Sequence, residues 1–273
     1  MTIHETAFLT CAYRSSDPEL SGDHYAYFYN NARTDNWVDA ITAEVSDKEP
    51  FLHCLRNRFF LDKITDFFGQ HPEGVLVNWG SGFSMYPFLI AKTVQCIDID
   101  QNDIISYKSD LLNDWIKKGK IPKRNVEYIK ADFRQNDLST LIKSLKSIID
   151  ARPCFFILEG VLYFLSPAVT EMVFIAMKEI QKTGDLLGCV SFLPDAADTA
   201  VLKNLNAFFD KNNFTDDTFS HQLLPHEFYT KRDGYVLKDH QDYCSLSQEY
   251  KPEMAIYDQF SILNENMYIL KRK

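Results

Sequence analysis

The chain has no excess of positive charge. Its 273 residues include 29 lysines and arginines but 38 aspartates and glutamates, which gives a formal net charge of −9 at pH 7. A protein whose main partner is a nucleic acid needs a basic surface to neutralise phosphates. The composition therefore argues against nucleic acid as a main partner.

Long apolar runs are also missing. No run approaches the ~20 apolar residues that span a bilayer. Residues 1–10 lack the basic, apolar and small-residue regions of a signal peptide. We therefore expect a soluble, cytoplasmic protein without a membrane partner.

Closely spaced cysteines are absent as well. The six cysteines are far apart in the sequence, and several lie in apolar runs. This usage predicts buried free thiols rather than disulfides or a zinc site. His221 and His226 are five residues apart but lack a convincing set of further ligands, so we expect no metal site.

What the chain does contain is a glycine turn between two apolar segments. Residues 75–77 form a short apolar run, Gly80-Ser81-Gly82 follows, and residues 83–91 are apolar again. A short apolar run bounded by glycine predicts a buried strand, and the change of period after the turn predicts the start of a helix. Because glycine has no Cβ, such a turn lets the backbone approach a ligand closely.

Four residues stand just after the first four predicted strands. They are Gly80, Asp100, Asp132 and Glu159, and Asp98 precedes Asp100 by two positions. In an open α/β sheet, ligands bind at the carboxyl ends of the strands, and an acid after the second strand binds the two hydroxyls of a ribose. The pattern therefore predicts a nucleoside-containing cofactor at one edge of the sheet.

Strand and helix patterns alternate through the middle of the chain. Apolar spacing predicts strands over residues 75–77, 93–97, 126–129, 154–158 and 186–193, and helices over residues 51–68, 104–118, 138–149, 166–182 and 199–211. Alternation of this kind predicts a mainly parallel sheet with helices on both faces. Two last strands, residues 235–243 and 267–272, have no predicted helix between them and predict an antiparallel hairpin at the sheet edge.

The expected fold is therefore an α/β fold with a Rossmann-like, seven-stranded, mostly parallel sheet and a C-terminal antiparallel hairpin. We expect one domain over residues 1–273, in which residues 51–273 form the core and residues 1–50 a helical cap or lid. The aromatic cluster of residues 24–29 is interpreted either as a lid over a pocket or as a helix packed on the core.

The glycine turn lacks one element of a dinucleotide-binding fingerprint. Met85 stands where the G-x-G-x-x-G pattern has its third glycine, which disfavours a pyrophosphate cofactor. S-adenosylmethionine has no phosphate. The order of elements resembles a class I S-adenosylmethionine-dependent methyltransferase. The local sequence resembles the leucine carboxyl methyltransferase family, which includes the polyketide-synthesis O-methyltransferases. The matching stretches are residues 56–62, 78–82, 98–100 with Lys108 downstream, 131–134 and 158–167.

The resemblance implies cofactor-binding roles for six residues. Arg58 would hold the carboxylate of S-adenosylmethionine, a pairing that suits a guanidinium, with Arg56 as the second candidate. Gly80 would line the methionine part of the cofactor. Asp100 would accept hydrogen bonds from the ribose hydroxyls.

The remaining roles concern the adenine and the reacting end of the cofactor. Asp132 would accept from the adenine amino group, and Phe133 would supply a backbone contact or pack on the ring. Glu159 would lie close to the amino group or the sulfonium. One motif departs from the family, because Ser84-Met85-Tyr86 stands where the family carries Asp-Thr-Arg. Substrate choice is therefore expected to differ from that of better-known members.

The implied activity is methyl transfer to an oxygen, a carboxylate or a hydroxyl, of a small acid or polyketide-like metabolite. A hydroxyl acceptor would be helped by a general base. His24, His221, His226 and His240 are candidates, but the sequence singles out none, and Tyr163 could orient the acceptor.

Other functions stay open at this point. Two belong to the same fold: methylation of a protein C-terminus and a catalytically silent scaffold. A third is a nicotinamide-dependent oxidoreductase, which the missing third glycine disfavours.

Overall fold

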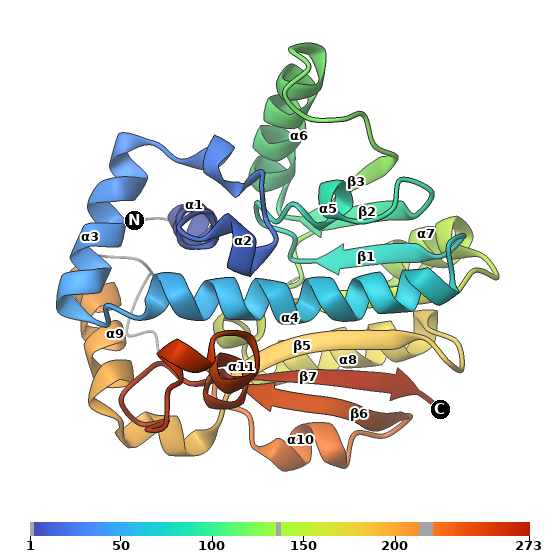
Figure 1. Ribbon diagram of the computed structural model, residues 1–273. Coiled ribbons are helices and arrows are strands. Elements are labelled where there is room, and N and C mark those ends of the chain that lie inside the picture. The colour runs from blue at the N-terminus through green and yellow to red at the C-terminus, as the bar shows by residue number, and fades with distance from the viewer. Residues whose placement is uncertain (1–2, 135–137, 213–220) are drawn as a thin grey trace.

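A seven-stranded sheet forms the centre of the computed structural model, which describes residues 3–134, 138–212 and 221–273 (Figure 1). Its spatial order is β3-β2-β1-β4-β5-β7-β6. The strands are β1 (Val75–Trp79), β2 (Gln95–Asp100), β3 (Val126–Lys130), β4 (Cys154–Leu158), β5 (Leu186–Phe192), β6 (Tyr235–Asp242) and β7 (Glu265–Arg272). The first five are parallel, and β7 runs antiparallel to both of its neighbours. The expected fold class is confirmed.

Helices cover both faces of this sheet. The α-helices are α1 (Ile3–Ser15), α2 (Pro18–Ser21), α3 (Ala32–Glu44), α4 (Glu49–Gln70), α5 (Tyr86–Leu89), α6 (Asn102–Lys117), α7 (Ser139–Ile149), α8 (Pro167–Ile180), α9 (Ala200–Lys211), α10 (His226–Thr230) and α11 (Tyr243–Tyr250). Four short 3-10 helices complete the described elements: η1 (Ala26–Tyr29), η2 (Leu162–Phe164), η3 (Pro194–Asp198) and η4 (Pro252–Met254). In Figure 1, α4 crosses in front of the sheet, and α7 and α8 lie behind it.

The central strand β4 shows how the sequence builds two cores. All five of its residues are buried, and side chains alternate between the faces of a strand. Phe155 and Ile157 belong to the core under α4, whereas Phe156 and Leu158 belong to the core under α7 and α8. A near-continuous apolar sequence is therefore required here, because both faces are covered.

The C-terminal strands correct one prediction. β6 and β7 pair antiparallel as expected, but α11 lies between them in the sequence, and β7 is inserted between β5 and β6. Asp242 and Ser245 form a capping box that starts α11, and Tyr243 and Leu246 are buried against the core under α4. The prediction that no helix joins these strands is wrong, because the capping box was not recognised.

The helix after the glycine turn is shorter than the apolar segment suggested. Only α5 forms, with Pro87 in its first turn, and Ile90 already has extended backbone (φ −104°, ψ 174°). Met85 and Phe88 pack into a third apolar cluster with Phe83 and Trp115. Residues 83–91 are therefore apolar mainly because they are buried.

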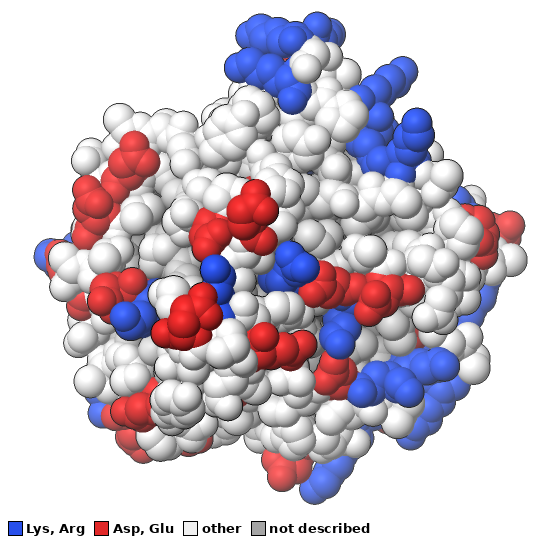
Figure 2. All heavy atoms as spheres, in the orientation of Figure 1, with Lys and Arg blue, Asp and Glu red and all other residues white. Residues whose placement is uncertain are grey.

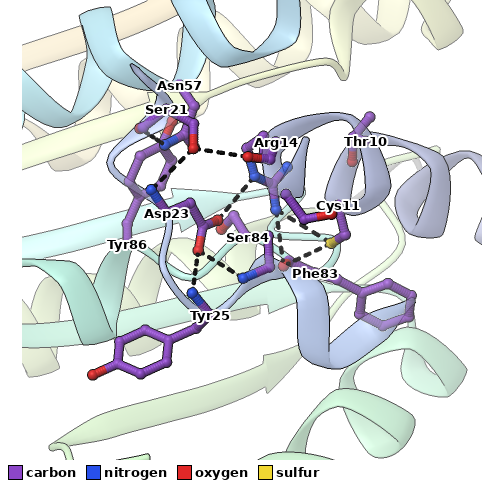
Figure 3. Close-up of polar contacts among 12 residues, drawn as sticks. Thr10, Cys11, Arg14, Ser21, Asp23, Tyr25, Asn57, Phe83, Ser84 and Tyr86 are labelled. Carbon is purple, nitrogen blue, oxygen red and sulfur yellow. Dashed lines mark hydrogen bonds and ion pairs between the residues drawn. The ribbon is translucent and has the colours of Figure 1, made fainter. Parts of the chain in front are cut away.

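The N-terminal helices are fastened to the segment that follows the glycine turn (Figure 3). Arg14 of α1 and Asp23 form an ion pair of 3.0 Å in which both side chains are buried. The same guanidinium donates to the carbonyl oxygen of Phe83 at 3.3 Å, as does the thiol of Cys11. These contacts hold α1 over the carboxyl end of β1, on the side to which the β1 arrow points in Figure 1.

The aromatic cluster of residues 24–29 packs on the core. The ring of Tyr29 stacks on Phe83 with centroids 4.8 Å apart, and Phe28 packs on Trp115 at 5.2 Å. The packed interpretation is therefore the better one for this cluster, and α1 covers the strand ends instead.

The face of the molecule shown in Figure 2 carries mixed charges. Lysine and arginine side chains gather over the end of α6 at the top of Figure 2, and acidic and basic side chains alternate over the centre of this face. All six cysteines are free thiols, and only Cys244 is not fully buried. Among the described residues, none of the helices combines the length and the apolar character needed to cross a membrane.

Candidate active site

A cavity of about 260 Å³ lies at the carboxyl ends of the parallel strands, beneath α1 and beside the first turns of α4. Five of the six residues expected to bind the cofactor line it: Gly80, Asp100, Asp132, Phe133 and Glu159. The topology thus brings these positions together from four different strand ends. The sixth residue, Arg58, does not reach the cavity.

The glycine turn forms one wall of the cavity. Gly80 (φ 75°) and Gly82 (φ 44°) have positive φ values that other residues rarely adopt. A Cβ at Gly80 would lie 2.3 Å from Cγ2 of Val161, which excludes any side chain there. The backbone N–H groups of Gly80 and Ser81 both donate to the carbonyl oxygen of Ile99, which ties the turn to β2.

Asp100 supports the same turn from the end of β2. Its Oδ2 accepts from the N–H of Gly82 at 2.7 Å, and its Oδ1 accepts from the N–H of Gln101 at 2.7 Å. Burial raises the pKa of this carboxyl, whereas the hydrogen bonds from Gly82 and Gln101 act in the opposite direction. The carboxylate is therefore held rigidly at the cavity wall.

Asp98 has a different role from Asp100. Its side chain is fully buried and lies 2.7 Å from Nζ of Lys108, which is fully buried too. Asn78 also donates to it at 3.2 Å. Asp98 is not among the cavity-lining residues. Of the two acids, Asp98 therefore forms an ion pair inside the core, and Asp100 lines the cavity.

Asp132 and Phe133 close the cavity beside β3. Asp132 accepts from Nε and Nη2 of Arg134 at 2.9 Å each, and these hydrogen bonds lower the pKa of its carboxyl. Phe133 is buried, and its ring lies 5.2 Å from that of Trp79. Asp132 thus supplies a carboxylate, and Phe133 an aromatic ring, to the same part of the cavity wall.

Glu159 lies at the centre of a buried polar network. It accepts from Nε of Arg56 at 2.7 Å and from the hydroxyl of Tyr86 at 2.6 Å. Nη1 of Arg56 donates to both carboxylate oxygens of Glu265, at 2.8 and 2.6 Å. Nη2 of Arg56 lies near Gly160, because a Cβ added at Gly160 would be 3.9 Å from it. One guanidinium thus joins α4, β4 and β7 at the cavity.

The structure corrects the assignment of Arg58. Its side chain is 38% exposed and forms an ion pair of 3.0 Å with Asp62 on the outer face of α4. Residues two apart on a helix lie about 200° apart around its axis, so Arg56 and Arg58 project to opposite sides. Because the buried side faces the cavity, Arg56 lines it and Arg58 cannot.

The four candidate histidines differ in whether they line the cavity. His221 lines the cavity, is held by a contact of 2.8 Å between its Nδ1 and Oδ1 of Asn206, and has its pKa lowered to about 4 by burial. His226 and His240 pack together, with ring centroids 4.8 Å apart, outside the cavity lining. His24 does not line the cavity either, and Tyr163 does.

The sequence does not single out several polar lining residues, among them Tyr13, Glu49, His53 and Glu265. Three of the cavity groups, Glu49, His53 and Arg56, fall four and three residues apart on α4, so they share one face with the apolar stripe. In the sequence, charged side chains that share the spacing of a buried apolar stripe indicate residues that face the interior, and this pattern could have identified the three. Glu265 lies just before the predicted last strand, where no pattern marked it.

A sequence profile described as leucine carboxyl methyltransferase matches residues 8–178 of this chain. The chain belongs to the leucine carboxyl methyltransferase family. A protein of Mycolicibacterium smegmatis, named as an S-adenosyl-L-methionine-dependent methyltransferase, is 22% identical over 257 residues, covering 86% of this chain and 83% of that protein. The expected enzyme class, a methyltransferase that depends on S-adenosylmethionine, is thereby confirmed.

Solved structures share the fold over almost the whole chain. A structure described as a methyltransferase from Thermobifida fusca YX has a TM-score of 0.64 at 17% identity, over 98% of this chain and 94% of that one. A DUF574 family protein from Streptomyces avermitilis has a TM-score of 0.63 at 13% identity, over 98% and 97% of the two chains. At such identities these likenesses concern the fold alone.

Each residue of Ser84-Met85-Tyr86 has a defined contact in the structure. Asn78 donates to Oγ of Ser84 at 2.5 Å, Met85 is buried in the cluster around Phe83, and Tyr86 donates to Glu159. Tyr86, whose phenol is kept neutral by burial, stands where the sequence resemblance leads us to expect an arginine. The guanidinium groups near Glu159 come instead from Arg56 and, at longer range, from Arg14.

Proposed function

We propose that this protein transfers a methyl group from S-adenosylmethionine to an oxygen, a carboxylate or a hydroxyl, of a small acid or polyketide-like molecule. The observation that carries the proposal is the composition of the single cavity described above. One side has carboxylates at the strand ends, which suit a nucleoside, and the other has apolar side chains beyond Arg56.

The residues of the first side fit the cofactor. Gly80 and Gly82 remove side chains from one wall, and the buried hydroxyl of Ser81 has no hydrogen-bond partner among the described residues. Asp100 would accept from the ribose hydroxyls, and Asp132 with Phe133 would hold the adenine. These assignments match the general rule for ligands at the switch point of a parallel sheet.

Two further residues would hold the methionine part of the cofactor. Glu159 would lie close to its amino group or sulfonium. Arg56 rather than Arg58 would bind its carboxylate, because Arg56 lines the cavity and its Nη2 lies near Gly160 at the cavity wall. A guanidinium nitrogen suits the cofactor's carboxylate.

The second side of the cavity is the proposed acceptor site. Its apolar lining comes from elements far apart in the sequence, namely Ile41 of α3, Phe192 of β5, Leu205 and Phe209 of α9, and Leu263. Such a lining excludes water and positions an organic acceptor for in-line attack. When bound, S-adenosylmethionine supplies an electrophilic methyl group, and the chain supplies geometry and exclusion of water.

Transfer of a labelled methyl group tests this proposal. Purified protein would be incubated with methyl-labelled S-adenosylmethionine and a panel of small carboxylic acids, small phenols and a peptide with a free C-terminal carboxylate. We expect label in small acceptors. Label in the peptide alone would favour methylation of a protein C-terminus. Cofactor binding without any transfer would favour a silent scaffold.

A further inference from the structure

Glu49 is a buried carboxylate without a cation of its own. It is the first residue of α4, its side chain is 6% exposed, and it lines the cavity. Its Oε1 has no hydrogen-bond partner within the described part of the chain. A buried polar oxygen is normally satisfied, so an orphan at a cavity wall points to a ligand that satisfies it.

His53, one turn further along α4, stands beside this carboxylate. Its Nδ1 lies 2.9 Å from the carbonyl oxygen of Glu49 and 3.8 Å from Oε2 of Glu49. A carbonyl only accepts, so Nδ1 carries the proton and the ring is oriented by the backbone. Burial lowers the pKa of His53 well below its ordinary value, which keeps the imidazole neutral.

The other titratable groups around Glu49 come from four elements. Arg56 lies on the same helix, Glu265 on β7, Tyr13 on α1 and Tyr243 on α11. Arg56 is already bonded to Glu159 and Glu265. The Tyr13 hydroxyl, like Oε1 of Glu49, has no hydrogen-bond partner among the described residues. Glu49 is therefore available to a ligand and has no cation of its own.

The cations of the cavity lining are committed elsewhere. Arg14 pairs with Asp23, Arg134 with Asp132, and Arg56 with two glutamates. The remaining nitrogen of Arg56 is the one proposed for the cofactor carboxylate. A carboxylate acceptor would therefore find no guanidinium left to receive it. At a pH where Glu49 is ionised and can act as a base, the charge of Glu49 would also repel such an acceptor.

We infer that Glu49 is the proton acceptor for methyl transfer to a hydroxyl group, and that the acceptor is an alcohol or phenol rather than a carboxylate. The inference rests on the proposed function. The hydroxyl oxygen forms the new bond to the methyl carbon while the carbon–sulfur bond breaks and its electron pair stays on sulfur. The hydroxyl proton passes to Oε1 of Glu49, so charge and atoms balance.

The environment of Glu49 gives this step a definite pH dependence. Burial, with a smaller contribution from Glu265, raises the pKa of Glu49 to about 8. A general base acts in its ionised form and is most effective when its pKa lies near the working pH. The rate of transfer is expected to rise with pH and to level off above about 8.

The test compares the wild type with Glu49→Gln, which keeps the shape of the side chain but cannot take the proton. Asp66→Asn, an exposed acid on the same helix, is the matched control. Acceptors are offered as pairs that differ only in the reacting group, such as 4-methylphenol and 4-methylbenzoate. An unactivated phenol has a pKa of about 10, so its proton is still bound when it enters the site. We expect transfer to the phenols, and a loss of about 10²- to 10⁴-fold in kcat/KM for Glu49→Gln only. The rising limb of the pH profile should disappear in that variant.

Binding measurements keep the test decisive. With S-adenosylhomocysteine present, calorimetry should show the phenol of a pair binding to the wild type more tightly than the benzoate. Any of four results would overturn the inference. They are transfer to benzoates only, transfer to neither member of any pair, benzoate binding as tight as phenol binding or tighter, and a Glu49→Gln pH profile that is the same as that of the wild type. S-adenosylmethionine binding is measured separately on each variant and reports whether the variant is folded. Loss of this binding in the wild type would count against the proposed function itself, whereas intact binding limits the failure to the inference about Glu49.

Discussion

Two buried acids of this chain differ in what faces them. Asp98 lies 2.7 Å from Nζ of Lys108 inside the core, so this buried acid has a cation of its own. Glu49 shares its nearest guanidinium, Arg56, with two other glutamates. At the residue scale, the site is therefore distinguished by a buried carboxyl group without a cation of its own rather than by the number of charged groups.

Glu49 should make the stability of the protein depend on pH. The folded protein holds the Glu49 proton up to a pKa of about 8, whereas the unfolded chain releases it near the ordinary value of 4.5. The unfolded state therefore binds fewer protons between these values, and the contribution of Glu49 to the free energy of unfolding falls as the pH rises. Glu49→Gln lacks this penalty, so it should exceed the wild type in stability at pH 9 but not at pH 5.

Urea unfolding of both proteins at the two pH values measures this difference. Asp66→Asn serves again as the control and should track the wild type at both. A Glu49→Gln effect of the same size at pH 5 and pH 9 would show that the carboxyl titrates normally in the folded protein.

The structure also requires a glycine at position 80. An alanine there would need φ near 75° and would place its Cβ 2.3 Å from Val161. Gly119 has a similar φ of 68°, but no atom lies within 4 Å of its added Cβ. Gly119→Ala should cost about 1 kcal/mol through backbone strain, and Gly80→Ala clearly more, because the clash is added. Equal losses in thermal unfolding would contradict the close packing of the turn on Val161.

Among the elements, α1 and α4 form the roof and side of the cavity. α1 contributes Thr6, Ala7, Thr10 and Tyr13 to the lining and is held by the Arg14 contacts with Asp23 and Phe83. A helix fixed at one end and facing a ligand should be stabilised when the ligand binds. We expect S-adenosylmethionine to slow amide hydrogen exchange in α1 much more than in α7, which lies behind the sheet. Equal protection of the two helices would argue against α1 as the cover of the site.

The elements also show what the sequence can and cannot predict. The parallel strands follow from apolar runs with a change of period, and their bounds differ from the prediction by a few residues at most. The helix α11 was missed because its start depends on Asp242 and Ser245 rather than on a long apolar stripe. Which of Arg56 and Arg58 lines the cavity depends on the rotation of α4 against the sheet, and their spacing of two residues in the sequence does not reveal it.

For the whole molecule, the topology explains why site residues found singly in the sequence meet in space. Parallel strands β1, β2, β3 and β4 all end at one edge, so Gly80, Asp100, Asp132 and Glu159 converge there. Glu49 and Glu265 could not be found in this way. They come from a helix start and from an antiparallel strand start, whose places at the cavity depend on packing between distant parts of the chain.

Calorimetric titration with S-adenosylmethionine tests the central claim most directly. The wild type should bind, and Asp100→Ala should bind about 10- to 100-fold more weakly, because a charged acceptor of the ribose hydroxyls is lost. Asp114→Asn, which changes an exposed acid on α6, should bind like the wild type, and NAD should not bind. A folded wild type that does not bind S-adenosylmethionine, or an Asp100→Ala variant that binds it unchanged, would contradict a cofactor site at the strand ends.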